Sequence, residues 1–142
     1  MSAYHFSHPI EVRYGDLDPQ GHVNNAKYLT YMEQARVAYI RHLGVWKGDS
    51  FLDIGIILAE VRITFLKPIT LGMDVRVAVR VSRLGNKSLT MEYRLENGPG
   101  GEQLASGDSV LVAYDYRSGE TIPVPNGWRL AIQNLEGPAL TS

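Results

Sequence analysis

The spacing of apolar residues along the chain divides it into strands and one long helix. Residues 9–14 alternate between apolar and polar positions, which predicts a half-buried strand. From Tyr28 to Leu43 the apolar residues recur every three or four positions, which predicts one buried stripe on a helix. Asn24 is suited to cap the start of this helix, and Gly44 is suited to end it.

Four further strands are expected after the helix. Alternation predicts strands over residues 55–66, 73–83, 89–95 and 102–116. In the first of these strands the expected inward-facing residues are Ile57, Ala59, Val61, Ile63 and Phe65. The segments 84–86 and 97–101 are rich in turn formers, so the strands that they join should pair antiparallel. A short C-terminal helix is indicated by Trp128, Ala131, Ile132 and Leu135.

This order predicts a single α+β domain over residues 1–142, in which a five-stranded antiparallel sheet wraps around one long helix (β-α-β-β-β-β). The helix should lie in the concave face of the sheet. The other face is expected to carry many apolar residues too, and the edges of the sheet are long. Such a unit should therefore pair with a copy of itself.

Composition narrows the class of protein. Hydrophobic residues make up 44% and charged residues 20%, as in ordinary globular proteins rather than disordered ones. The net charge of −1 indicates neither a nucleic-acid-binding surface nor a basic membrane-binding one. The absence of cysteine excludes disulfides, thiolate metal ligands and a cysteine nucleophile. The sequence has neither a signal peptide nor a membrane span of about 20 apolar residues, so a cytoplasmic protein is expected.

The segment just before the long helix concentrates polar groups. It contains the carboxylates of Asp16 and Asp18, the imidazole of His22, and the amides of Asn24 and Asn25. The first backbone N–H groups of a helix lack partners within the helix and favour negative charge. A carboxylate beside such donors suits acyl transfer, because one group attacks or activates water while a fixed N–H stabilises the oxyanion.

This segment also has simpler interpretations. Asp16 and Asp18 could do no more than cap turns. An EF-hand is excluded, because Lys27 stands where the loop needs its bidentate Glu. No metal site is expected at His22, since no second His follows at a helical spacing. The chain also lacks a Gly-x-Ser-x-Gly elbow and a glycine-rich phosphate loop between strand and helix.

The same segment resembles the signature of the 4-hydroxybenzoyl-CoA thioesterase-type hotdog family. The resemblance rests on Asp-Leu-Asp-Pro-Gln-Gly-His-Val-Asn-Asn-Ala-Lys-Tyr-Leu at 16–29 and on Tyr-Met-Glu-Gln-Ala-Arg at 31–36. It implies that Asp18 is the catalytic carboxylate and that the backbone N–H of Asn25 is the oxyanion donor. It further implies an acyl-CoA thioesterase, a thioester hydrolase, that forms a homodimer or homotetramer with active sites between subunits. Coenzyme A is part of the substrate, so no separate cofactor is expected.

Each of the other residues near the signature has two possible interpretations. His22 either orients Asp18 or the attacking water, or makes a structural hydrogen bond. Asn24 is a helix cap or a substrate contact. Tyr28, like Tyr31 and Tyr39, belongs to the core or lines an acyl pocket. Glu33 and Arg36 are most simply a pair on the helix surface or at an interface.

The turn after the strand predicted at 73–83 carries cations. In the family this region approaches the nucleotide of CoA, whose phosphates need cations. The residues concerned are Arg83, Lys87 and Ser88. A solvated hairpin tip is the simpler interpretation of the same residues.

Other functions remain open at this point. Plant-type acyl-ACP thioesterases have a similar segment, but Gln20 departs from their Asn and the chain has the length of one hotdog repeat. An acyl-ACP substrate, a hotdog hydratase or dehydratase, and an acyl-CoA-binding module without catalysis are the alternatives. The sequence does not identify the acyl group.

Overall fold

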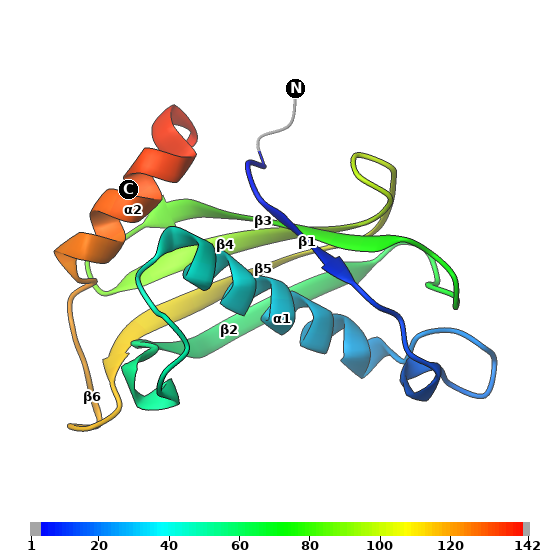
Figure 1. Cartoon of the computed structure of the whole chain (residues 1–142), viewed down its shortest axis with the longest axis horizontal. Helices are drawn as coiled ribbons and strands as arrows, with labels where there is room; N and C mark the ends of the chain where they lie inside the picture. Colours follow the sequence, from blue (N-terminus) through cyan, green and yellow to red (C-terminus); the bar gives the residue numbers. More distant parts are fainter. Residues whose placement is uncertain (1–3, 141–142) are drawn as a thin grey trace.

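One long helix, α1 (Asn25–Leu43), lies across the concave face of a curled antiparallel sheet (Figure 1). The computed structural model describes residues 4–140. The main strands are β1 (Ser7–Ile10), β2 (Ile56–Phe65), β3 (Val75–Leu84), β4 (Ser88–Asn97) and β5 (Glu102–Asp115). They lie in the order β1-β3-β4-β5-β2, and the short strand β6 (Glu120–Thr121) pairs with β5. The predicted α+β architecture is confirmed.

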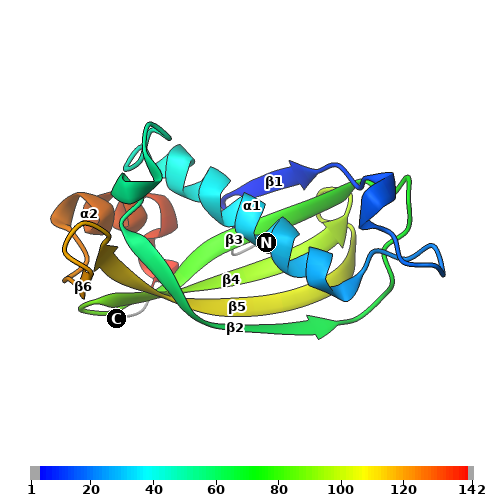
Figure 2. The same ribbon diagram turned by 90° about the horizontal axis from the view of Figure 1, so that it is seen from below.

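The helix begins and ends where the sequence predicts. The side chain of Asn24 accepts a hydrogen bond from the N–H of Ala26 at 2.9 Å, and Gly44 ends the helix with φ of 78°. The stripe that faces the sheet is buried: Tyr28, Tyr31, Met32, Ala35 and Tyr39. Figure 2 shows the helix lying along the sheet rather than at its edge.

The helix comes very close to the sheet at Gly107 of β5. A Cβ atom at this position would lie 2.7 Å from the carbonyl oxygen of Arg62 and 3.0 Å from the terminal methyl of Met32. Only glycine leaves room there for both the neighbouring strand and the helix.

The first strand differs from its prediction over residues 9–14. It runs from Ser7 to Ile10, and Tyr14–Asp16 form a 3-10 turn. Ile10 pairs with Val75, the first residue of β3, so the segment after Ile10 has no partner strand. Tyr14, the last apolar position in the alternation of residues 9–14, is 85% exposed.

The inward face of β2 also differs from its prediction. Leu58 pairs with Leu111 and Glu60 pairs with Val110, so Ala59 is the extra residue of a β-bulge. A bulge reverses the alternation of side chains along a strand. The predicted alternation therefore holds for Val61, Ile63 and Phe65, whereas Ile56 and Leu58 replace Ile57 on the inner face.

The outer face of the sheet carries ion pairs, where many apolar residues were predicted. Arg80 on β3 pairs with Glu92 on β4 at 2.6 Å, and Arg94 pairs with Glu96 at 2.8 Å. The exposed apolar side chains lie elsewhere, mainly along the edge strand β2 and the turn that precedes it. They include Phe51, Leu52, Ile57, Leu58, Val61 and Phe65.

The C-terminal helix α2 (Asn126–Glu136) packs against β3 beyond Ala78, the residue that pairs with the first residue of β1. Its last residue, Glu136, is only 2% exposed. One oxygen of this carboxylate accepts hydrogen bonds from the Tyr39 hydroxyl of α1 and from the N–H of Val81 in β3. This carboxylate therefore ties both helices to one edge of the sheet.

Candidate active site

The loop between β1 and α1 is fixed by backbone hydrogen bonds at several points. Within the loop, the N–H of Asp18 donates to the carbonyl of His22 at 2.7 Å. The N–H of Val23 donates to Ile69 at 2.8 Å, and His22 forms an isolated β-bridge with Thr70. The loop is thus anchored to the segment that follows β2, far away in the sequence.

Asp18 caps a turn and also faces a pocket. Its Oδ1 atom accepts hydrogen bonds from the backbone N–H groups of Gln20 at 2.9 Å and His22 at 3.1 Å. This is the turn-forming role that the simpler interpretation expected. No residue among 4–140 donates a hydrogen bond to the other oxygen, Oδ2. Asp18 lines a pocket of about 360 Å³, so one oxygen holds the loop while the other is available for chemistry.

The pocket combines this loop, the start of α1 and the end of β2. Asp18, His22, Asn25 and Tyr28 all line it. The ring of Tyr28 packs edge to face on Phe65, with centroids 4.9 Å apart. Four of the predicted site residues are therefore neighbours, with an aromatic wall beside them.

Asn25 is the first residue of α1, and its backbone N–H is free. Asn24 accepts hydrogen bonds from Ala26 and Lys27, through its side chain and its carbonyl respectively. The N–H of Asn25 has no acceptor within the described part of the chain. Asn25 lines the pocket that also contains Asp18. A free N–H at a helix N-terminus there can stabilise a developing oxyanion.

His22 contacts Asp18 through its backbone, not through its ring. The ring lines the pocket and makes no hydrogen bond to any residue of 4–140. Asn24 is exposed and caps the helix. The structure thus supports the structural interpretation of Asn24, and a role of either residue toward substrate stays a prediction.

Asp16 is more than the simple turn former that the sequence indicated. It is 1% exposed, and its carboxylate accepts hydrogen bonds from the Tyr31 hydroxyl at 2.7 Å and the Arg13 N–H at 3.1 Å. Burial alone would raise the pKa of Asp16. The bonds from Tyr31 and Arg13 and the charges of Arg13 and Lys27 outweigh burial and lower this pKa. The ionised carboxylate of Asp16 therefore holds the loop against α1 through its hydrogen bond with Tyr31.

Replacing Tyr31 with Phe should destabilise the protein in a pH-dependent way. The variant loses a hydrogen bond to a buried charge, which costs about 1–3 kcal/mol of unfolding free energy near neutral pH. Because the folded-state pKa of Asp16 is lowered, its stabilisation is present above the ordinary Asp pKa and is lost as the pH falls through the folded value. Urea unfolding over a pH series measures the difference between wild type and Tyr31→Phe.

Tyr14→Phe is the matched control, because Tyr14 is 85% exposed. It should change the unfolding free energy little at any pH. A cost of Tyr31→Phe that stayed constant down to the lowest pH at which the protein folds would contradict this account of Asp16.

The predicted nucleotide-contact residues lie at the other end of the sheet. Arg83 lies near the end of β3, Lys87 lies in the turn between β3 and β4, and Ser88 begins β4. Ser88 pairs with Val112, which pairs with Ile57 near the start of β2. Phe65, in the wall of the Asp18 pocket, ends that strand about 25 Å farther along. Figure 1 shows the turn beside α2, away from the loop that precedes α1. A single chain does not bring these three residues to the Asp18 pocket.

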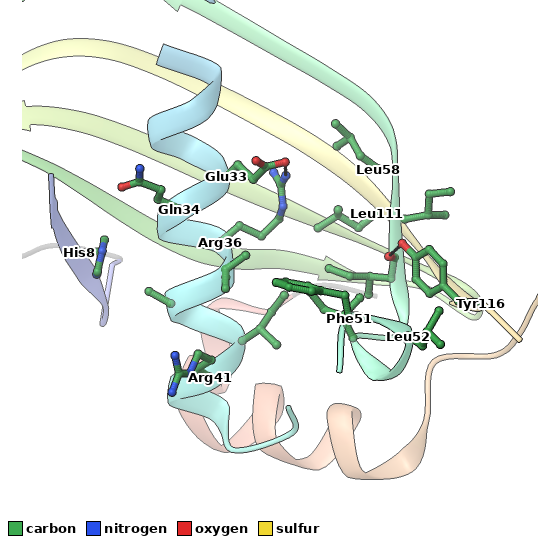
Figure 3. Close-up of a pocket in the computed structure, with 16 residues that line it drawn as sticks. His8, Glu33, Gln34, Arg36, Arg41, Phe51, Leu52, Leu58, Leu111 and Tyr116 are labelled. Carbon is green, nitrogen blue, oxygen red and sulfur yellow. Dashed lines mark hydrogen bonds and ion pairs between the residues drawn. The ribbon is translucent and has the colours of Figure 1, made fainter. Parts of the chain in front are cut away.

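A second, larger groove of about 930 Å³ lies between the C-terminal half of α1 and the start of β2 (Figure 3). Arg36 lines it and is only 7% exposed. The predicted pair with Glu33 is present, with Nη2 of Arg36 3.7 Å from the Glu33 carboxylate. Arg36 is buried rather than on the surface, and its guanidinium also donates to the hydroxyl of Tyr93 beneath the helix. Its position one turn after Met32 on the buried stripe is the sequence signal for this burial.

Two absences hold for residues 4–140. No group of three or more His, Asp or Glu side chains is arranged to hold a metal ion. No helix in that range is long and apolar enough to cross a bilayer.

Known proteins resemble this chain over nearly its whole length. Residues 12–132 match the thioesterase-like superfamily. A thioesterase from Thermus thermophilus, crystallised with coenzyme A and Zn, is 39% identical with a TM-score of 0.83, over 96% of this chain and 98% of its own. The long-chain acyl-CoA thioesterase FadM of Escherichia coli K12 is 22% identical over 126 residues, 89% of this chain and 96% of that protein.

A third protein agrees in fold. Slr0204 from Synechocystis, a 1,4-dihydroxy-2-naphthoyl-CoA thioesterase, is 19% identical with a TM-score of 0.81, over 94% of this chain and 98% of its own. These matches confirm the predicted hotdog fold, and the proteins named here are thioesterases, which are hydrolases of thioesters. The chain belongs to the thioesterase-like superfamily.

Proposed function

We propose that the protein hydrolyses acyl-CoA thioesters to a free acid and CoA, and that the reaction takes place in the Asp18 pocket. One observation carries the proposal: Asp18, which has a carboxylate oxygen that accepts no hydrogen bond from residues 4–140, and Asn25, which has a free N–H, line the same pocket. The names of the relatives from Escherichia coli and Thermus thermophilus support an acyl-CoA substrate. The finer likeness to the 4-hydroxybenzoyl-CoA type rests on the signature at 16–36.

Two routes fit this geometry. In the first, Asp18 attacks the thioester carbonyl, the C–S bond breaks and CoA thiolate leaves. Water then attacks the Asp18 carbonyl of the mixed anhydride and releases the free acid. In the second, Asp18 takes a proton from a water molecule that attacks the same carbonyl. In both, the N–H of Asn25 donates to the oxyanion. A single turnover in oxygen-18 water separates them, because only the first route leaves the label in Asp18.

A thiol-release assay tests the proposal directly. The wild-type protein is incubated with short-chain, long-chain and aromatic acyl-CoAs, and free CoA is measured with a thiol reagent. Release well above the uncatalysed rate for at least one of them supports the proposal. Binding of acyl-CoA without release would identify a non-catalytic acyl-CoA-binding module instead, and release from acyl-ACP alone would identify the carrier as ACP.

The exposed edge of β2 supports a homodimer, or a homotetramer built from such dimers. An apolar, unpaired edge strand is a template for pairing with a second chain. If two copies of β2 pair antiparallel about a twofold axis, the Phe65 end of one lies beside the Ile56 end of the other. The Asp18 pocket of one copy then lies next to the β3–β4 turn and the larger groove of its partner. Active sites between subunits would follow.

A charge on this edge should dissociate the dimer. Wild-type protein should show at least twice the chain mass of 15.8 kDa by light scattering. Val61→Lys, with Val61 36% exposed on β2, should shift the mass to that of a monomer because pairing would desolvate the ammonium group. Leu130→Lys on α2, where Leu130 is 61% exposed, is the control and should keep the wild-type mass. A fully active wild-type monomer would contradict the dimer.

Removal of the cations at the β3–β4 turn should weaken substrate binding. The turn is well fixed, since Arg129 donates to the carbonyls of Gly85 and Asn86. If Arg83 and Lys87 contact CoA phosphates across the dimer, replacing both with Ala should raise KM and leave kcat largely unchanged, because these contacts are equal in ground and transition states. Steady-state kinetics measures both constants.

Lys47→Ala, at another exposed cation, should change neither constant. An unchanged KM in the double variant would mean that the turn is only a solvated hairpin tip.

A further inference from the structure

A buried cation faces the larger groove. The lining of this groove is mainly apolar and includes Val37, Phe51, Leu58 and Leu111 (Figure 3). Arg36 belongs to the same lining, and its side chain is only 9% exposed. A guanidinium with so little access to water requires hydrogen-bond acceptors or an opposite charge nearby.

Arg36 is fixed from the side of the sheet. Its Nη1 donates to the hydroxyl of Tyr93 at 3.1 Å. That hydroxyl is hydrogen-bonded to the Oγ of Ser109 at 2.7 Å, and both residues are buried on the concave face. These neutral groups orient the guanidinium but do not balance its charge.

The guanidinium of Arg36 has one charged partner among the described residues, and that partner is exposed. The nearest carboxylate is that of Glu33, 3.7 Å from Nη2 and 68% exposed. No residue among 4–140 accepts a hydrogen bond from Nε or Nη2 of Arg36. Arg41 adds a second cation to the lining, and Glu33 is the one carboxylate among the described residues that line it. The groove therefore combines apolar walls with an excess of positive charge and unused donors.

We infer that the groove takes the distal end of an acyl group and that this end carries a carboxylate, which Arg36 binds. The inference rests on the proposed thioesterase function and on the dimer, which brings the groove of one copy beside the Asp18 pocket of the other. A guanidinium matches a carboxylate with two parallel N–H groups. A methyl-terminated chain would fill the apolar walls but leave these donors without an acceptor. The substrate class is the CoA monothioester of a dicarboxylic acid, and Arg36 determines the specificity.

Paired substrates test this inference. Each carboxyl-terminated acyl-CoA is compared with the methyl-terminated acyl-CoA of the same carbon number. For the best chain length, the wild-type kcat/KM should favour the carboxyl-terminated member. Arg36→Met should lower the ratio of the two kcat/KM values about 10- to 100-fold, the range for a hydrogen bond to a charged group. Arg36→Lys keeps the positive charge but loses the two parallel N–H groups of the guanidinium, so its ratio should lie between those of wild type and Arg36→Met.

Arg80→Met is the matched control, because Arg80 pairs with Glu92 on the outer face of the sheet. Its ratio should equal that of wild type. A purely structural role of Arg36 would lower both kcat/KM values alike and leave the ratio unchanged, which would overturn the inference. So would an Arg36→Met variant whose only defect is dissociation of the dimer.

Binding to wild-type protein gives a second readout that does not depend on any variant folding. Non-hydrolysable thioether analogues of each pair are titrated by calorimetry, and the carboxyl-terminated analogue should bind about tenfold or more tightly. Equal or weaker binding would overturn the inference. Hydrolysis of methyl-terminated substrates alone would leave the thioesterase proposal intact and overturn only the carboxylate site. No thiol release from any acyl-CoA would defeat both.

Discussion

Replacing Asp18 with Asn should lower kcat at least about a hundredfold, the low end for loss of a general base. The Asn side chain keeps an oxygen that can accept the N–H groups of Gln20 and His22, so the loop should hold its shape. What disappears is the negative charge of the carboxylate and the basicity of the oxygen that accepts no hydrogen bond within residues 4–140. KM should change little, since the helix terminus and the pocket walls remain. Steady-state thiol release, with thermal melts to verify folding, measures this effect.

Asp115→Asn is the matched control. Asp115 also closes an exposed turn, with its Oδ1 accepting the N–H groups of Arg117 and Ser118, and it lines neither the Asp18 pocket nor the larger groove. Its substitution should leave kcat unchanged. Asp16→Asn should mainly cost stability, because Asp16 is buried against Tyr31. Near-normal turnover in Asp18→Asn with a folded but inactive Asp16→Asn would assign the catalytic carboxylate to Asp16 instead.

Replacing Asn25 with Pro should lower kcat about 100- to 1,000-fold, the usual effect of removing one oxyanion donor. Proline has no N–H, so the substitution deletes the donor itself. The fold should tolerate it, because proline is favoured at the first position of a helix. The preceding residue, Asn24, already has φ of −59° and ψ of 138°, the extended conformation that a following proline requires.

Asn25→Ala separates the side chain from the backbone. This variant keeps the N–H and should retain kcat within a few fold of wild type. Comparing kcat of the two variants measures the contribution of the Asn25 N–H alone. Circular dichroism verifies that α1 is still formed. Equal loss in both variants would mean that the side chain matters and that the oxyanion donor lies elsewhere.

The elements that could be predicted from the sequence are those set by local pattern. The helix carries its own stripe, cap and stop, so its ends agree with the structure. The first strand could not be delimited, because its end depends on where β3 begins. The bulge at Ala59 could not be predicted either. A β-bulge is defined by how two strands pair, with two residues of one strand opposite one residue of the other, so the sequence of one strand does not indicate it.

The candidate site shows the same division. Asp18, His22, Asn25 and Tyr28 stand close together in the sequence, and the structure has them around one pocket. Phe65 and Lys67 also line that pocket, although they lie far from the loop in the sequence. No local sequence pattern predicts such a long-range contact. By residue type and position alone, Asp16 and Asp18 are equally good candidates for the catalytic carboxylate, and only the family resemblance favours Asp18. The structure separates them, because Asp16 is buried and accepts the hydroxyl of Tyr31, whereas Asp18 lines the pocket.

The placement of the Asp18 loop and the larger groove at opposite ends of β2 has a genetic consequence. Under the proposed antiparallel pairing, each working centre draws its carboxylate from one copy and its groove from the other. Two different defective alleles, one damaged in the loop and one in the groove, would therefore complement each other in the same cell. In a dimer of one copy of each variant, one active site contains both defects and the other active site contains neither.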